Sequence, residues 1–146
     1  MKKILFLAIV AILAFGCSKE GETPMEQKEV STYSLYYGYS ARDVVAQKLS
    51  YDAHLTETLF FYEYDANNNK IDQKRWENPQ VGQEKTFTAN DSAIKAVVKY
   101  EIHGTLKDGS EYASSRYLQE VIKLSKGNNS VITMSASTKM SENSPI

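Results

Sequence analysis

The stretch from Leu55 to Glu77 decides the fold class, and it is written LTETLFFYEYDANNNKIDQKRWE. Its first part alternates between two sets of residues, so that Phe60 and Tyr62 share one face of an extended chain. The run from Asp65 to Lys70 is rich in Asp and Asn, which favour turns and tolerate positive φ. Ile71 to Glu77 is extended again, so the whole stretch predicts a β-hairpin.

The same alternation recurs along the rest of the chain after Val30. Period-two patterns predict further strands over residues 33–39, 86–88, 94–102, 112–124 and 131–138. Turn-forming residues separate these strands about every ten residues. The sequence therefore predicts an all-β fold, a single antiparallel β-sandwich of about seven or eight strands with an immunoglobulin-like or transthyretin-like layout.

Within this fold, the two faces of the strand over residues 55–64 are expected to differ. The face with Phe60, Tyr62 and Tyr64 is predicted to be buried. The opposite face carries Glu57 and Glu63, which are expected to be solvated.

One segment, residues 41–50, fits two patterns. Ala41, Val44, Val45, Lys48 and Leu49 lie at helical spacing, but the same segment also alternates as a strand. The β pattern on both sides of it favours a strand.

The N-terminus predicts export. Met1-Lys2-Lys3 is followed by twelve uncharged, mostly apolar residues, then by Gly16 and the only cysteine of the chain, Cys17. As a helix, this apolar segment would reach about 18 Å, which is short of the roughly 30 Å hydrocarbon core of a bilayer. We therefore expect a signal peptide that targets the chain and does not span the membrane permanently.

Gly16-Cys17 resembles the end of the lipobox of bacterial lipoproteins. Ala14 and Phe15 depart from the usual pattern, as in the looser lipoboxes of the Bacteroidota, and residues 18–22 are similar to a surface-export signal of those lipoproteins. The resemblance implies that Cys17 becomes the mature N-terminus and carries palmitate-type acyl chains. It also implies an outer-membrane location that faces the cell surface or, alternatively, the periplasm; stable anchoring needs about two chains.

These predictions divide the chain into a signal peptide over 1–16, a flexible tether over 17–30, a β-sandwich domain over 31–140 and a tail over 141–146. Loss of Lys2 and Lys3 with the signal lowers the 17 basic residues to 15, against 18 acidic residues, a formal charge of −3. This charge and the lack of a basic run argue against nucleic acid as a partner.

Catalytic and metal-binding patterns are sparse. The only histidines are His54 and His103, so we predict no catalytic residues, no cofactor and no enzyme activity. A cleft joining either histidine to a carboxylate would favour an enzyme instead. Residues 65–69, DANNN, resemble a calcium loop, but Lys70 replaces the required glycine, so we predict a plain turn and no metal site.

Aromatic residues are the main indication of binding, with ten tyrosines and one tryptophan in the chain. Trp76 stands among charged residues and is expected to be exposed. Exposed rings can stack on sugars or anchor a protein interface, so Trp76 and Tyr36 are candidate binding residues. The alternative is that the aromatic residues fill the core, because they favour strands.

Asp91-Ser92-Ala93 resembles the sequon that Bacteroidota use for O-glycosylation of exported proteins, which makes Ser92 a candidate modification site. Two functions remain for the whole chain. The first is a non-catalytic interaction or structural module at the cell envelope with a protein partner. The alternative is a carbohydrate-binding accessory lipoprotein that stacks glycans on exposed aromatic residues.

Overall fold

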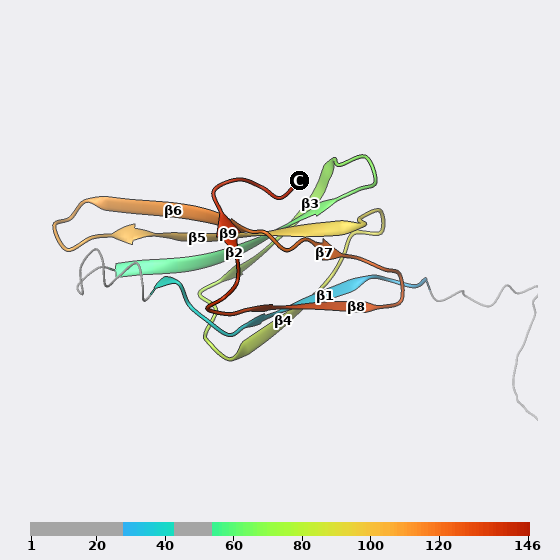
Figure 1. Cartoon of the computed structure of the whole chain (residues 1–146), viewed down its shortest axis with the longest axis horizontal. Helices are drawn as coiled ribbons and strands as arrows, with labels where there is room; N and C mark the ends of the chain where they lie inside the picture. The colour runs from blue at the N-terminus through green and yellow to red at the C-terminus, as the bar shows by residue number, and fades with distance from the viewer. Residues whose placement is uncertain (1–27, 43–53) are drawn as a thin grey trace, which may run out of the picture.

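The computed structural model describes residues 28–42 and 54–146, which contain nine β-strands (Figure 1). The strands are β1 (Thr32–Tyr37), β2 (His54–Tyr64), β3 (Lys70–Glu77), β4 (Gln83–Thr88), β5 (Lys95–Thr105), β6 (Glu111–Leu118), β7 (Ile122–Lys123), β8 (Asn129–Met134) and β9 (Met140–Ser141). They confirm the all-β prediction. The described strands outnumber the predicted seven or eight partly because the strand expected over residues 112–124 is divided into β6 and β7.

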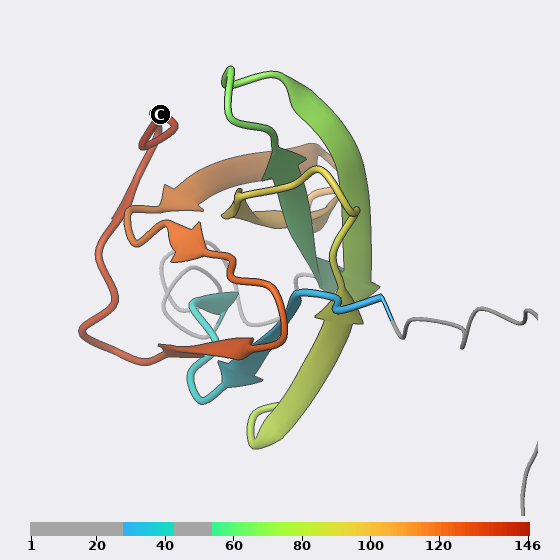
Figure 2. The same cartoon turned by 90° about the vertical axis from the view of Figure 1, so that its right-hand side faces the viewer.

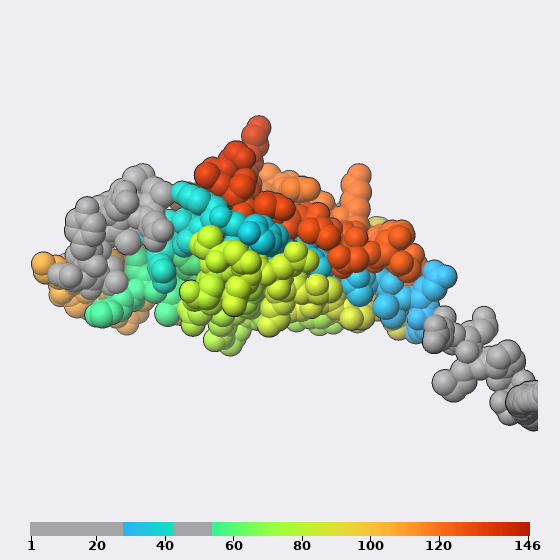
Figure 3. Space-filling view, turned by 90° about the horizontal axis from the view of Figure 1, so that it is seen from below, coloured from blue at the N-terminus to red at the C-terminus, as the bar shows by residue number. Residues whose placement is uncertain are grey.

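The strands form two sheets that pack face to face (Figure 2). The smaller sheet has the order β4-β1-β8, and Figure 3 shows β1 between β4 (yellow-green) and β8 (orange-red). The larger sheet has the order β3-β2-β5-β6-β9, with β7 paired to β5. Side chains from the inner faces of both sheets meet between them, as in a β-sandwich.

β8 departs from the predicted topology. The sequence predicts that the chain returns after Gly127 as the second strand of a hairpin, but β8 instead joins the smaller sheet and pairs with β1 in parallel. This pairing buries Ile132 and Met134 in the core. A hairpin with β7, which has two residues, would offer β8 too few partners.

Two of the turns predicted between strands, over residues 65–70 and 107–110, are confirmed. In the turn between β2 and β3, Asp65 Oδ1 accepts hydrogen bonds from the N–H groups of Asn67 at 2.8 Å and Asn69 at 3.0 Å. Asn68 adopts a φ of 63°, which Asn tolerates better than most residues. Gly109, with a φ of 87°, closes the turn between β5 and β6.

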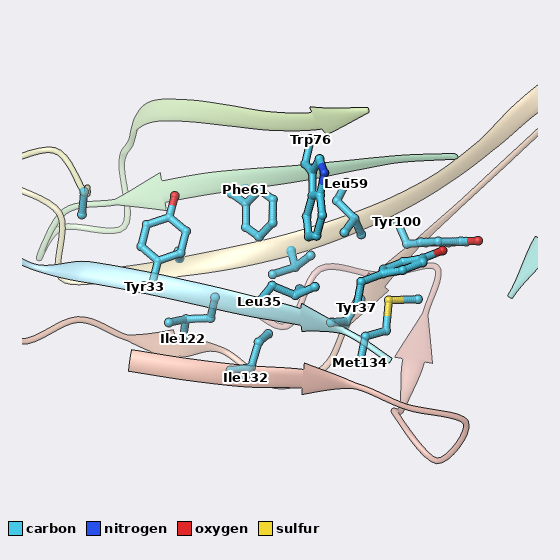
Figure 4. Close-up of a cluster of buried hydrophobic side chains, with 14 of the residues drawn as sticks. Tyr33, Leu35, Tyr37, Leu59, Phe61, Trp76, Tyr100, Ile122, Ile132 and Met134 are labelled. Atoms are coloured by element: carbon cyan, nitrogen blue, oxygen red, sulfur yellow. The ribbon is translucent and has the colours of Figure 1, made fainter. Parts of the chain in front are cut away.

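The core takes the face of β2 opposite to the one predicted. Leu59 and Phe61 are fully buried between the sheets, whereas Phe60 and Tyr64 are half-buried on the outer face, so the prediction that the Phe60 face forms the core was wrong, although Tyr62 on that face is buried. Full burial of a side chain such as Phe61 contributes about 2 kcal/mol. The large core residues in Figure 4 are Tyr33, Leu35, Tyr37, Leu59, Phe61, Trp76, Tyr100, Ile122, Ile132 and Met134.

Two tyrosine–glutamate hydrogen bonds join the sheets across this core. Tyr33 Oη donates to Glu63 Oε2 at 2.6 Å, and Tyr37 Oη donates to Glu57 Oε1. Glu63 is fully buried and also accepts a hydrogen bond from Lys74 Nζ at 2.7 Å. The prediction that the two glutamates are solvated was wrong, because polar partners within the protein replace the water that they would otherwise bind.

Several predictions concern residues outside the described ranges. The signal peptide, Cys17 and most of the tether lie within 1–27, and most of the ambiguous segment 41–50 lies within 43–53. At the end of the tether, Lys28 Nζ forms an ion pair with Asp91 Oδ2 at 2.5 Å. Among the described residues, no helix has the length and apolar character needed to cross a membrane.

Candidate binding surface

Trp76 lies in the core and not on the surface. On β3 it pairs with Leu59 of β2, is 8% exposed, and meets the ring of Tyr37 edge-on with 6.1 Å between centroids (Figure 4). The prediction of an exposed tryptophan was wrong because side chains alternate along a strand, so its exposed neighbours Arg75 and Glu77 project from the opposite face. A buried indole offers no free face to a ligand.

Tyr36 is exposed on the outer face of the smaller sheet. It is 38% exposed and lies between Glu84 of β4 and Thr133 of β8 in the strand register. Val131, which is 54% exposed, precedes Thr133 by two residues on the same face. One ring beside a valine gives only a small contact area for a ligand.

Ser92 is exposed in the turn between β4 and β5, where a modifying enzyme can reach it. Its N–H donates to Asn90 Oδ1 at 3.0 Å. The adjacent Asp91 is held by the ion pair with Lys28, and its carbonyl accepts a hydrogen bond from Lys126 Nζ at 2.5 Å. Modification of Ser92 remains a prediction.

A group of aromatic and basic side chains lies on the outer face of the larger sheet. Phe60 of β2 pairs with Lys99 of β5, and Tyr117 of β6 pairs with the other side of Lys99. Four residues further along β2, Tyr64 lies between Lys95 of β5 and Lys70 of β3. We call this surface the aromatic–lysine face, and it consists of Phe60, Tyr62, Tyr64, Tyr117, Lys70, Lys95 and Lys99.

Lysine ammonium groups are held close to the rings of this face. Lys99 Nζ lies 5.2 Å from the ring centroid of Phe60 and 5.6 Å from that of Tyr62, and Lys70 Nζ lies 4.5 Å from that of Tyr62. The two rings are nearly parallel, with 6.2 Å between centroids and 2° between planes. Such cation–π contacts contribute about 0.5–1 kcal/mol each at exposed sites, so they favour positions of positive charge beside the rings.

The aromatic–lysine face is well packed. Val97 is fully buried although it pairs with Tyr62 on the outer side of the sheet, so its neighbours on that side cover it. Phe60, Tyr64 and Tyr117 are half-buried. These three rings therefore remain partly accessible, whereas Tyr62, which is 9% exposed, is buried beside Lys70 and Lys99.

Electrostatic interactions favour a charged Lys99 and a neutral Tyr64. Burial disfavours the ammonium form of Lys99, but the Tyr62 hydroxyl and the nearby Tyr117 and Glu101 outweigh it and raise the pKa of Lys99 above its ordinary value. Burial, with contributions from Tyr117 and Tyr62, raises the pKa of Tyr64. This face therefore presents the ammonium group of Lys99 and the neutral hydroxyl of Tyr64 as hydrogen-bond donors.

Both histidines are exposed and lie nearer the turn between β5 and β6. A hollow of about 270 Å³ is lined there by His103, Gly104, Thr105, Glu111, Tyr112 and Ala113. His103 and Glu111 are diagonal neighbours in the register, and no hydrogen bond joins their side chains in the described part of the chain. His103 Nε2 lies 3.1 Å from Thr56 Oγ1. The hollow thus brings an imidazole and a carboxylate to one place without coupling them.

The structure does not bring Trp76, Tyr36 and Ser92 together, since they lie in the core, on the smaller sheet and in a turn. The aromatic–lysine face was missed because its period-two rings were assigned to the core. Lys95 and Lys99, at alternate positions of the next long strand, are the signal that could have indicated it. Within residues 28–42 and 54–146, no three His, Cys, Asp or Glu side chains gather as a metal site.

Comparison of the chain with protein-family models, with curated proteins and with solved structures gives no match. The chemistry of the side chains described above is therefore the main guide to function.

Proposed function

We propose that this chain is a lipid-anchored, exported, non-catalytic binding module of the cell envelope, and that its ligand is a carbohydrate held on the aromatic–lysine face. The proposal joins the two functions expected from the sequence and moves the binding role from Trp76 to the outer face of the larger sheet. Cys17 supplies the anchor in the outer membrane, and residues 18–27 supply a spacer.

The single observation that carries the proposal is the gathering of three half-buried aromatic side chains, Phe60, Tyr64 and Tyr117, and three lysines around the buried Tyr62 on the outer surface of one sheet. Aromatic rings offer apolar faces to the C–H groups of a sugar, and phenol hydroxyls and ammonium groups donate hydrogen bonds to its oxygens. A rigid sheet holds such groups at fixed spacings, which lowers the entropy lost on binding.

We also propose an immunoglobulin-like or transthyretin-like layout for the sandwich. Two packed sheets with mostly antiparallel pairing support it, and the parallel pairing of β1 with β8 departs from a purely antiparallel arrangement. This layout hosts many functions, so the carbohydrate proposal depends on the face and not on the fold.

A glycan array with the full-length protein in nonionic detergent tests the proposed function. We expect binding to at least one glycan class and an affinity about tenfold weaker for Tyr117→Ala, equivalent to about 1.4 kcal/mol. Tyr36→Ala, which removes an exposed ring from the other sheet, is the matched control and should bind as the wild type does. If the wild-type protein binds no glycan, the proposal is wrong.

A further inference from the structure

We infer that the aromatic–lysine face selects acidic polysaccharides, that is, polymers of sugars that carry carboxylate or sulfate groups. This inference rests on the proposed function and specifies its ligand.

The charge distribution of the outer face supports an acidic ligand. Residues that pair side by side across the strands form rows, and Phe60, Tyr62 and Tyr64 each lie in one row. These three rows contain no acidic residue and five basic residues, Lys70, Arg75, Lys95, Lys99 and Lys123. The first carboxylates, Glu77 and Glu101, appear in the next row along β2, where Glu77 forms an ion pair with Arg75 and leaves the four lysines as the main positive charge. A chain with a formal net charge of −1 thus concentrates positive charge on one part of one sheet.

The extent of this charge favours a polymer over a small anion. The row of Phe60 and the row of Tyr64 are four residues apart along β2, about 13 Å at the rise of a β-strand. Lys99 lies in the first row and Lys95 in the second. A polysaccharide with repeated acidic groups is long enough to contact both rows at once.

The burial of the aromatic rings argues against a lipid bilayer as the ligand of this face. Tyr62 is 9% exposed, and none of the large apolar side chains that are well exposed among the described residues belongs to this face. Insertion into a bilayer needs projecting apolar side chains. Half-buried rings beside ammonium groups are better suited to a flat sugar ring with a charged substituent.

The test compares sodium polygalacturonate with the same polymer after reduction of its carboxyl groups. We expect the full-length protein to bind the acidic polymer at least tenfold more tightly, and to lose most of this difference at high salt because exposed charges are screened. The variants Lys99→Gln and Lys95→Gln should each weaken binding of the acidic polymer about three- to tenfold. Lys85→Gln is the matched control, since Lys85 also lies near an aromatic ring, 5.8 Å from that of Phe87, but on the smaller sheet.

Equal binding of the acidic and reduced polymers would overturn the charge selection while leaving a carbohydrate-binding function in place. If Lys85→Gln weakens binding of the acidic polymer as much as Lys99→Gln and Lys95→Gln do, the inference is also wrong. Positive charge on either sheet would then account for the binding. Binding of single-stranded DNA as tightly as polygalacturonate would show a general anion surface and overturn it too. Failure of all glycans to bind would remove both this inference and the proposed function.

Discussion

Glu63 shows how a carboxylate can be accommodated at the centre of this fold. Tyr33 Oη and Lys74 Nζ donate to Glu63 Oε2, and the N–H of Asn90 donates to Oε1 at 2.7 Å. A charge-assisted hydrogen bond contributes more than a neutral one, and a buried carboxylate that loses a donor keeps its desolvation penalty. The hydroxyl of Tyr33 therefore matters for stability as well as its ring.

We expect Tyr33→Phe to lower the free energy of unfolding by about 1.5–3 kcal/mol, because it removes one donor to Glu63 and leaves the ring in place. Urea denaturation monitored by fluorescence measures this change. Tyr36→Phe, at an exposed position of the same strand, should change stability by less than about 0.5 kcal/mol. Equal effects of the two variants would show that the Tyr33–Glu63 hydrogen bond adds nothing.

Three buried tyrosines predict a loss of stability at alkaline pH. Burial, followed by the hydrogen bond to Glu63, raises the pKa of Tyr33 well above its ordinary value of 10.0. Burial together with the Glu57 carboxylate does the same for Tyr37 and Tyr100. The folded state thus keeps protons that the unfolded state releases, so this stabilisation is complete below about pH 10 and is lost as pH rises above it.

Absorbance at 295 nm measures this effect, since it follows the ionisation of tyrosine. We expect Tyr33, Tyr37 and Tyr100 to remain protonated above pH 10 while the fold persists, and to ionise together when it unfolds. Titration of all ten tyrosines in a single step near pH 10, with the native circular dichroism spectrum retained, would contradict the burial of these hydroxyls.

At the scale of strands, the sequence predicts positions better than faces. The period-two pattern places β2, β3 and their turn correctly, because local turn chemistry and alternation depend on near neighbours. Both faces of β2 carry aromatic residues, so alternation alone cannot say which one is buried. Tyr33 and Tyr37 of the smaller sheet favour burial of the face with Leu59 and Phe61, because their hydroxyls donate hydrogen bonds to Glu63 and Glu57 on that face.

The same limit applies to the candidate binding residues. The burial of Trp76 follows from its place opposite Leu59, which is a matter of strand register and not of the charged residues next to it in sequence. Likewise, the aromatic–lysine face combines side chains from four strands. Its parts are visible in the sequence as alternating Phe, Tyr and Lys, but their assembly depends on long-range pairing.

The contact between β2 and β5 at Gly104 gives a prediction for these elements. A Cβ at Gly104 would lie 2.0 Å from the backbone carbonyl oxygen of His54, and its φ of 155° disfavours a side chain. We expect Gly104→Ala to lower the free energy of unfolding by about 2–4 kcal/mol, because the two strands must separate locally.

The matched control is Gly109→Ala in the adjacent turn. Its φ of 87° is also unfavourable for alanine, but its Cβ would meet no atom within 4 Å, so we expect a cost of about 1 kcal/mol. Thermal denaturation of both variants gives the comparison. If Gly104→Ala proves no more costly than Gly109→Ala, the close approach of the two strands is not a constraint on stability.

For the molecule as a whole, Cys17 should affect location and not folding. The described core residues all lie between Tyr33 and Met134, well after Cys17. We expect Cys17→Ser to abolish incorporation of an alkyne fatty acid and to change the free energy of unfolding by less than about 0.5 kcal/mol. Equal labelling of wild type and variant, or labelling of neither, would contradict the lipoprotein assignment.

The pairing of β1 with β8 has a consequence for the timing of folding. The hydroxyl of Thr32 and the carbonyl of Asn128, which meet at the start of this pair, are 96 residues apart in sequence. In a chain that is exported N-terminus first, as proposed, the central strand of the smaller sheet crosses early but gains its second neighbour only after residue 134 has followed. Contacts of such long range form slowly. If the chain is exported as proposed, the smaller sheet can close only after β8 has followed β1 across the membrane.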